Sequence, residues 1–238
     1  MEDERRTSPW VFVGVGCLVA VVILVAIVGS VIWWGVSAIR ELEATMEDPV
    51  ARTELARGML AADEIPEGYN AVIALKIPFL METVVLSDQE PDEDGRIDGF
   101  GERGFIYFKA LSMGEQEQEL RDFFDGETDS SDLLEQTTQV RVNAEEFIGR
   151  GVIEEDDRTL RWVTYRGEVG DRDSAQFGDG LTAMVMFECP GAERVRMGIW
   201  FGPDPDPDTP VDSADLSGSV ADEVEIQRFM RNFDVCSR

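Results

Sequence analysis

The chain has 238 residues, of which 49 are acidic and 21 basic, and its formal net charge is −28. A field of this sign repels phosphate backbones, which excludes nucleic acid as a partner. The hydrophobic fraction of 43%, with 13 Phe and 5 Trp, is typical of a packed core and excludes a wholly disordered chain.

The N-terminal region contains a long apolar segment. No charged residue occurs within residues 7–39. A helix that spans a bilayer needs about 20 predominantly apolar residues, and this segment exceeds that length. It is also too long for a cleaved signal peptide, whose apolar region has roughly 7–15 residues. We therefore expect an uncleaved transmembrane helix over residues 10–39, after a short tail of residues 1–9.

Tryptophans mark both ends of this predicted span. Trp10 stands at its start, and Trp33 with Trp34 near its end. Indole side chains favour the two membrane interfaces, so these three residues are the expected interface anchors. Lysine and arginine are nearly balanced on the two sides of the span and do not decide its orientation. The short N-terminal tail favours a cytoplasmic N-terminus and an extracytoplasmic C-terminal domain.

The span is followed by a predicted helical stalk and then by one domain. Residues 40–63 read as a juxtamembrane helical segment, in which Asp48 and Pro49 form an N-cap and first helical position. A turn at residues 65–68 then opens an acidic globular domain, residues 64–238.

Within the domain, apolar residues recur at strand period. The expected strands are residues 69–77, 79–86, 105–108, 138–142, 146–153, 160–169, 181–189 and 195–201. Two helices are expected, one over residues 112–124 after a capping box and one over residues 219–233 capped by Ser219. This order predicts an α+β fold: an N-terminal transmembrane helix, followed by a mostly antiparallel β-sheet with two packed helices.

Two cysteines lie in the domain. Cys189 ends a predicted strand and Cys236 follows the last predicted helix, so the two can meet. In an exported domain they would form a disulfide, whereas in a cytosolic domain they would be two buried thiols. The chain contains no histidine, which excludes a Cys–His nucleophile and a His-ligated zinc site.

The loop after the second predicted strand resembles the start of an EF-hand calcium loop. Its oxygen ligands would be Glu90, Asp92, Asp94 and Asp98. Gly95 falls at the position of the sharp turn, but Gly101 stands where the loop needs a bidentate glutamate. The flanks also read as strands rather than helices. A solvated acidic loop is the competing interpretation, and Ca²⁺ is the single cofactor that the sequence suggests.

Function is less constrained than architecture. The sequence contains no P-loop, no G-x-S-x-G and no H-E-x-x-H motif. The leading hypothesis is a non-enzymatic binding or scaffolding module that holds an unknown protein partner at the cell envelope. A Ca²⁺-stabilised extracytoplasmic domain and a small hydrolase that uses carboxylates are the alternatives. Gly16 and Ala20 form a small-xxx-small pair through which the membrane helix could form a homodimer.

Overall fold

The computed structural model describes most of the chain after residue 47. The described ranges are residues 48–77, 80–92, 97, 100–111, 115–128, 140–171, 176–192 and 194–237. The predicted span at residues 10–39, with its anchors Trp10, Trp33 and Trp34, lies outside these ranges and stays a prediction. In the described part of the chain, no helix has both the length and the apolar character needed to cross a membrane.

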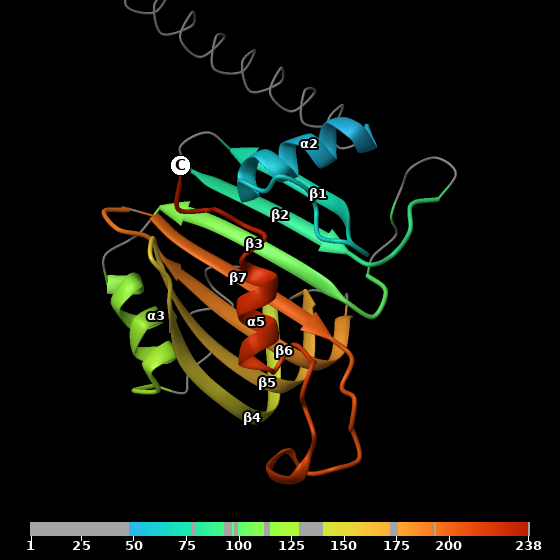
Figure 1. Cartoon of the computed structure of the whole chain (residues 1–238), viewed down its shortest axis with the longest axis vertical. Coiled ribbons are helices and arrows are strands. Elements are labelled where there is room, and N and C mark those ends of the chain that lie inside the picture. The colour runs from blue at the N-terminus through green and yellow to red at the C-terminus, as the bar shows by residue number, and fades with distance from the viewer. Residues whose placement is uncertain are drawn as a thin grey trace, which may run out of the picture. The chain divides into compact units, whose positions relative to one another are not determined.

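Seven antiparallel strands form one sheet (Figure 1). They are β1 (Asn70–Ile77), β2 (Met81–Ser87), β3 (Gly104–Leu111), β4 (Val140–Glu154), β5 (Thr159–Asp171), β6 (Gln176–Glu188) and β7 (Arg194–Gly202). Their order in the sheet is β1-β2-β3-β7-β6-β5-β4. The last strand therefore lies in the middle, between β3 and β6. This sheet with its helices confirms the predicted α+β class and mostly antiparallel pairing.

One edge of the sheet differs from its predicted segmentation. The expected strands at residues 138–142 and 146–153 are one continuous strand, β4. Its pairing with β5 shifts register between Ala144 and Glu146, and again between Phe147 and Gly149. Each shift moves the apolar pattern by a residue, which reads in the sequence as an interruption.

Three α-helices pack on the described sheet: α2 (Pro49–Leu60), α3 (Glu115–Asp125) and α5 (Glu223–Met230). A short 3₁₀ turn, η1, covers Val211–Ser213. Helix α2 overlaps the predicted juxtamembrane helix and begins as expected, because Asp48 Oδ1 accepts a hydrogen bond of 2.9 Å from the Val50 amide. Its Ala56 and Leu60 are fully buried, so α2 packs against the sheet.

The N-cap of α5 differs from the predicted one. Asp222 caps this helix by accepting a hydrogen bond of 2.9 Å from the Val224 amide. Ser219 instead donates its hydroxyl proton to the Leu216 carbonyl oxygen at 2.6 Å. Both residue types favour N-caps. Asp222 lies three positions after Ser219, and the helix starts there.

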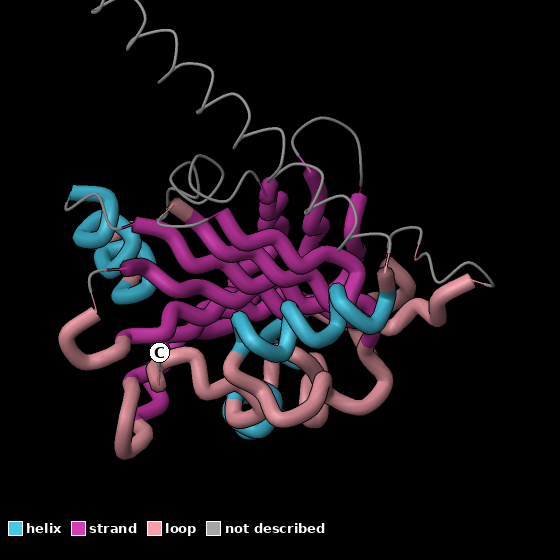
Figure 2. Tube along the Cα trace, turned by 90° about the horizontal axis from the view of Figure 1, so that it is seen from above, coloured by secondary structure: helices cyan, strands magenta, loops and turns pink. Residues whose placement is uncertain are grey.

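The two faces of the sheet bury different side chains. Helices α2 and α5 cover one face, here the first face, whose core is largely aromatic (Figures 1 and 2). On it, Phe105 stacks on Phe233 with 4.8 Å between ring centroids, and Trp200 stacks on Phe229 at 4.4 Å. Rigid rings in fixed mutual orientation define this core.

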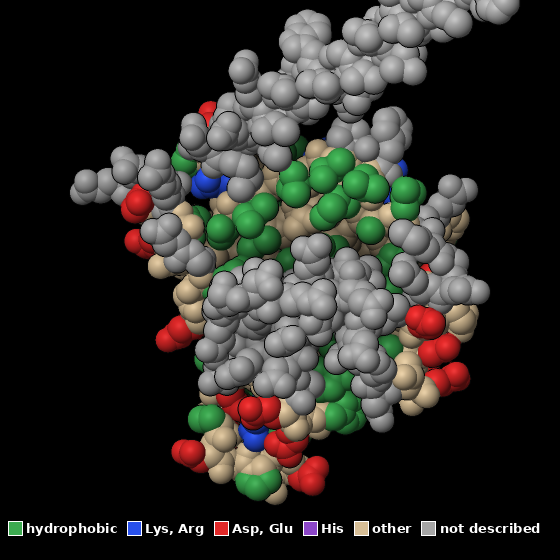
Figure 3. Space-filling model, turned by 180° about the vertical axis from the view of Figure 1, so that it is seen from behind, with side chains coloured by type: hydrophobic (Ala, Val, Ile, Leu, Met, Phe, Trp, Pro, Cys, Tyr) green, Lys and Arg blue, Asp and Glu red, His purple; other side chains and the backbone are tan. Residues whose placement is uncertain are grey.

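Helix α3 packs on the opposite face, here the second face, beside three buried methionines. Those methionines are Met184, Met186 and Met197. Figure 3 looks at this face and shows hydrophobic side chains gathered over the first strands of the sheet. Ile77, Leu80 and Leu111, at one end of these strands, are 38%, 56% and 49% exposed.

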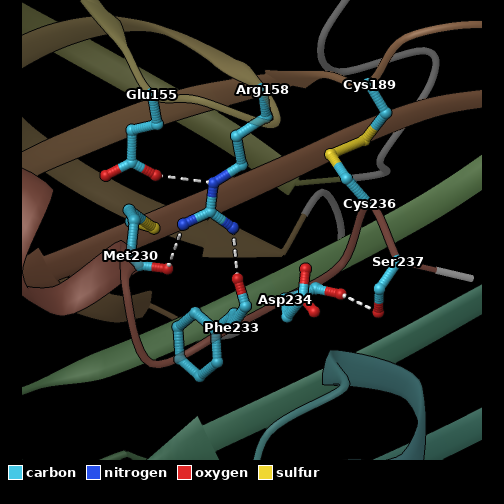
Figure 4. The surroundings of a disulfide bond; sticks show 8 residues. All are labelled: Glu155, Arg158, Cys189, Met230, Phe233, Asp234, Cys236 and Ser237. Atoms are coloured by element: carbon cyan, nitrogen blue, oxygen red, sulfur yellow. Dashed lines mark hydrogen bonds and ion pairs between the residues drawn. A yellow bond between two sulfur atoms is a disulfide. The ribbon is translucent and has the colours of Figure 1, made fainter.

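The end of α5 is fixed by a cation and by a covalent bond (Figure 4). Arg158 Nε binds Glu155 at 2.7 Å, while Nη2 and Nη1 donate to the carbonyl oxygens of Met230, at 3.2 Å, and Phe233. The guanidinium satisfies carbonyls that a helix end leaves without intrahelical partners. A disulfide joins Cys189, just after β6, to Cys236, with Cα atoms 5.2 Å apart.

Candidate binding cleft

A cleft of about 420 Å³ opens where α5, the end of β7 and the turn before β1 meet. We call it the aromatic cleft. It is lined by Pro66, Glu67, Tyr69, Arg103, Trp200, Pro203, Pro205, Ser217, Gly218, Ser219, Val220, Glu225 and Phe229. Its volume falls within the range of roughly 300–1,000 Å³ that is usual for ligand sites.

Three aromatic rings form the floor of the cleft. Trp200 and Phe229 are stacked with an interplanar angle of 1°, and the Tyr69 ring lies 5.4 Å from that of Phe229. Trp200 Nε1 donates a hydrogen bond of 2.9 Å to the Tyr69 hydroxyl. Burial raises the pKa of Tyr69, although the Trp200 hydrogen bond opposes the shift, so its hydroxyl stays protonated at neutral pH. The ring positions are therefore fixed before any ligand arrives.

Arg103 forms a side wall of the cleft. Its guanidinium carbon lies 5.5 Å from the centroid of the Tyr69 ring, within the range of a cation–π contact. Arg103 Nε also pairs with Asp88 Oδ2 at 3.5 Å. Gly68, with φ +80°, provides the turn that brings Tyr69 beneath this guanidinium, and a side chain at position 68 would be strained.

The opposite wall belongs to the loop of residues 203–210, here the proline loop. Arg166 of β5 holds this loop with three donors: Nε binds Asp204 Oδ2 at 2.6 Å, Nη1 donates to the Thr209 carbonyl oxygen at 2.8 Å, and Nη2 donates to the Asp206 carbonyl oxygen at 3.2 Å. A Cβ at Gly180, where φ is +144°, would lie 2.6 Å from the Gly202 carbonyl oxygen. Glycine at position 180 therefore lets the end of β7, which leads into the proline loop, lie close to β6.

The turn of residues 217–219, here the serine turn, closes one end of the cleft. All three of its backbone amides are used internally. Ser217 N donates to Asp215 Oδ1 at 3.2 Å, Gly218 N to Asp222 Oδ2 at 2.9 Å, and Ser219 N to the Leu216 carbonyl oxygen at 3.1 Å. The turn therefore presents no free amide donors to a ligand.

The lining also contains polar side chains. The cleft contains two serines and two glutamates, but the chain has no histidine to serve as a base. Ser219 donates its hydroxyl proton to a backbone carbonyl rather than to a general base. Pairing with a positioned base is what activates a serine nucleophile.

The residues predicted for calcium are only partly described. Glu90 and Asp92 are exposed in the loop after β2, whereas Asp94 and Asp98 lie outside the described ranges. Among the described residues, no three acidic, cysteine or histidine side chains come together as a metal site would require. The predicted disulfide candidates are Cys189 and Cys236. A disulfide joins them, and they are separated by 47 positions in the sequence.

The cleft residues were not identified from the sequence as a site. Tyr69, Arg103, Trp200 and Phe229 come from four segments whose proximity depends on β7 entering the middle of the sheet. One local signal was present: a tryptophan close before a Pro-Asp repeat places a large ring where a strand leaves the sheet. That signal marks the end of a strand, but it does not name the other three residues.

Comparison with known proteins adds little to this geometry. No family model matches the chain, and no curated protein matches it. Among solved structures, human StAR-related lipid transfer protein 5 is similar with a TM-score of 0.20 and 12% identity, over 84% of this chain and 94% of that one. A similarity at this level carries no argument about fold or function.

Proposed function

We propose that the chain is a single-pass membrane protein whose domain is a non-enzymatic binding module for another protein at the cell envelope. The observation that carries this proposal is the aromatic floor of the cleft, where Tyr69, Trp200 and Phe229 are locked together. Rings that are held in place before binding lose little conformational entropy when a partner arrives. Tyrosine and tryptophan are also the residues that dominate binding energy in protein interfaces.

Anchoring forms the second part of the proposal. Residues 10–39 would fix the module to the bilayer, with the domain on the extracytoplasmic side. The disulfide between Cys189 and Cys236 supports this side, because such bonds persist in oxidising compartments and are rare in the cytosol. After reduction in intact cells, a thiol reagent that does not cross membranes should label both cysteines. Labelling that requires membrane permeabilisation would reverse the orientation.

A photo-crosslinking experiment tests the binding function. A benzophenone amino acid replaces Pro205, an exposed cleft residue, in the full-length chain in its native membrane. We expect a discrete adduct that disappears when Ser217→Trp fills the cleft. Ser213→Trp, at an exposed position in η1 outside the cleft, is the matched control and should leave the adduct intact. An adduct that survives Ser217→Trp would contradict the cleft as the binding site.

A further inference from the structure

Few backbone hydrogen-bond donors are free in the cleft. The amides of the serine turn are already used, as is the indole N–H of Trp200. Pro66, Pro203 and Pro205 line other walls, and proline has no backbone N–H to offer. Arg103 is therefore the main donor left for an anionic ligand, and its guanidinium already lies over the Tyr69 ring and pairs with Asp88.

The same cleft is rich in negative charge. Glu67 lies exposed on its rim, and no cation of the described residues is close enough to form an ion pair with it. Glu225 also lines the cleft, but it forms an ion pair of 2.5 Å with Arg228 Nη1. Arg103, the one basic side chain in the lining, already pairs with Asp88. The charge left for a ligand is therefore negative, and the chain's overall charge of −28 adds to it.

Within the cleft, a cation of the chain itself already lies over one of the aromatic rings. The Arg103 guanidinium stands 5.5 Å from the Tyr69 ring centroid while Asp88 neutralises it. An aromatic face with a carboxylate nearby suits a planar guanidinium, which stacks and donates hydrogen bonds together. The apolar remainder of the lining, with Val220 and the prolines, suits a hydrophobic neighbour of that cation.

From these observations we infer that the aromatic cleft takes a peptide segment of a partner protein in which an arginine stands next to an apolar residue. The arginine lies against the aromatic floor and donates to Glu67, while the apolar side chain contacts the prolines. This inference rests on the proposed binding function and specifies the chemistry of its partner. The fixed walls, held by Arg166 and by Gly68, select an extended segment that fits without rearrangement of the cleft.

The test uses the full-length chain in neutral detergent micelles and three fluorescently labelled blocked peptides of sequence Pro-X-Pro-Leu. X is arginine, glutamine or glutamate, and binding is followed by fluorescence anisotropy. We expect the arginine peptide to bind at least about 10-fold more tightly than the glutamine peptide, with no saturable binding of the glutamate peptide. A rise in salt from about 50 mM to about 500 mM should weaken binding of the arginine peptide several-fold, because its contact with Glu67 is partly exposed to solvent.

Glu67→Gln is the decisive variant. It should weaken binding of the arginine peptide by roughly 5-fold and leave the affinity for the glutamine peptide unchanged, since only the charged contact is lost. Glu64→Gln removes an equally exposed carboxylate three residues away, outside the cleft, and should change neither. Equal weakening by both variants would show a general effect of net charge and would overturn the inference. Equal binding of the arginine and glutamine peptides would overturn it as well.

The two proposals fail in distinguishable ways. If the crosslink at position 205 disappears with Ser217→Trp but the arginine peptide binds no more tightly than the glutamine peptide, the cleft binds a partner of another chemistry. The binding function then stands and the inference is wrong. If no adduct depends on the cleft, yet the arginine peptide binds in a Glu67-dependent way, the preference for cations is correct but the native partner lies elsewhere.

Discussion

The cores on the two faces of the sheet differ in their side chains. The first face carries stacked rings, with Phe105 on Phe233 and Trp200 on Phe229, and opens at one end into the cleft. The second face buries three methionines under α3. Aromatic rings have few rotamers and preferred mutual geometries, whereas methionine adapts its shape to the available space.

This contrast explains why the candidate site lies on the first face. A binding floor needs side chains whose positions are set in advance, and on the first face Trp200 is held by its stack on Phe229 and its hydrogen bond to Tyr69. The disulfide and Arg158 secure the same face, since both hold the end of α5, the helix that carries Phe229. The second face has rings as well, Phe123, Phe124 and Phe201, but its three methionines give that core side chains that can repack. The comparison therefore predicts unequal tolerance to substitution.

The largest expected difference follows from one substitution on each face. Phe233→Ala removes a ring that is fully buried and stacked, and it should lower the free energy of unfolding by roughly 3–5 kcal/mol. Met197→Ala makes the same kind of truncation on the second face and should cost only about 2 kcal/mol, because the neighbouring methionines can repack. Urea unfolding of the fragment Met46–Arg238 measures both. Similar losses for the two variants would remove the distinction between the faces.

Removal of the disulfide should have the next largest effect. A bond that closes a loop of 47 residues stabilises the fold by about 3–4 kcal/mol in the chain-entropy description. The double variant Cys189→Ala, Cys236→Ala should lose this amount in urea unfolding. Its cleft should also loosen, because Cys236 follows the helix that carries Phe229. Treatment of the unsubstituted chain with reductant is the control, and a double variant as stable as the oxidised chain would contradict the prediction.

Arg158 provides a smaller and more specific test. Its side chain is 5% exposed, and Arg158→Met would remove the donor to the Phe233 carbonyl oxygen and one of two donors to that of Met230, at a cost of about 3 kcal/mol. Arg231 binds the same Glu155 at 3.0 Å but is 63% exposed. Arg231→Met should therefore cost less than about 1 kcal/mol. Equal costs in thermal unfolding would mean that the ion pair, and not the capped carbonyls, matters.

The sequence predicted the elements better than their pairing. Apolar alternation located most of the strands, because it reports which side chains face a core. The placement of β7 between β3 and β6 was not predictable, since it depends on contacts between segments about 90 residues apart, such as Phe105 with Trp200. The two bulges in β4 broke the alternation and divided one strand into two.

The site was less predictable than the fold for the same reason. Cys189 and Cys236 could be named as a candidate pair because a strand end and a helix end were expected to meet, with two buried thiols as the alternative. The cleft has no such local marker. Its character depends on Trp200 donating to Tyr69 across 131 positions, and on amides of the serine turn that are consumed by Asp215 and Asp222. Hydrogen bonds of this kind are specified by the folded backbone rather than by residue type.

A final contrast within the first face concerns its buried carboxylate. Lys76 and Lys109, the two lysines of the chain, bind the two oxygens of Glu82 at 2.8 Å and 3.2 Å. Burial raises the pKa of Glu82, but the hydrogen bonds and charges of the two lysines outweigh it, so the pKa lies below the ordinary value of 4.5. A carboxyl with a depressed folded pKa stabilises the fold fully above its unfolded pKa, and this contribution disappears as pH falls through the folded value.

Stability should therefore fall as the pH drops below about 4.5, and Glu82→Gln should flatten part of that decline. We expect an effect of no more than about 1 kcal/mol, because Lys76 is half exposed and the pair is screened by solvent. Glu64→Gln is the control. It removes an exposed carboxyl away from the two lysines and should leave the decline of stability with pH unchanged. Urea midpoints between pH 3 and pH 7 give the measurement. If Glu82→Gln leaves the acid slope as steep as before, the ion pairs of Glu82 with the two lysines contribute nothing measurable to the free energy of unfolding. A neutral side chain at this position of the first face would then serve as well.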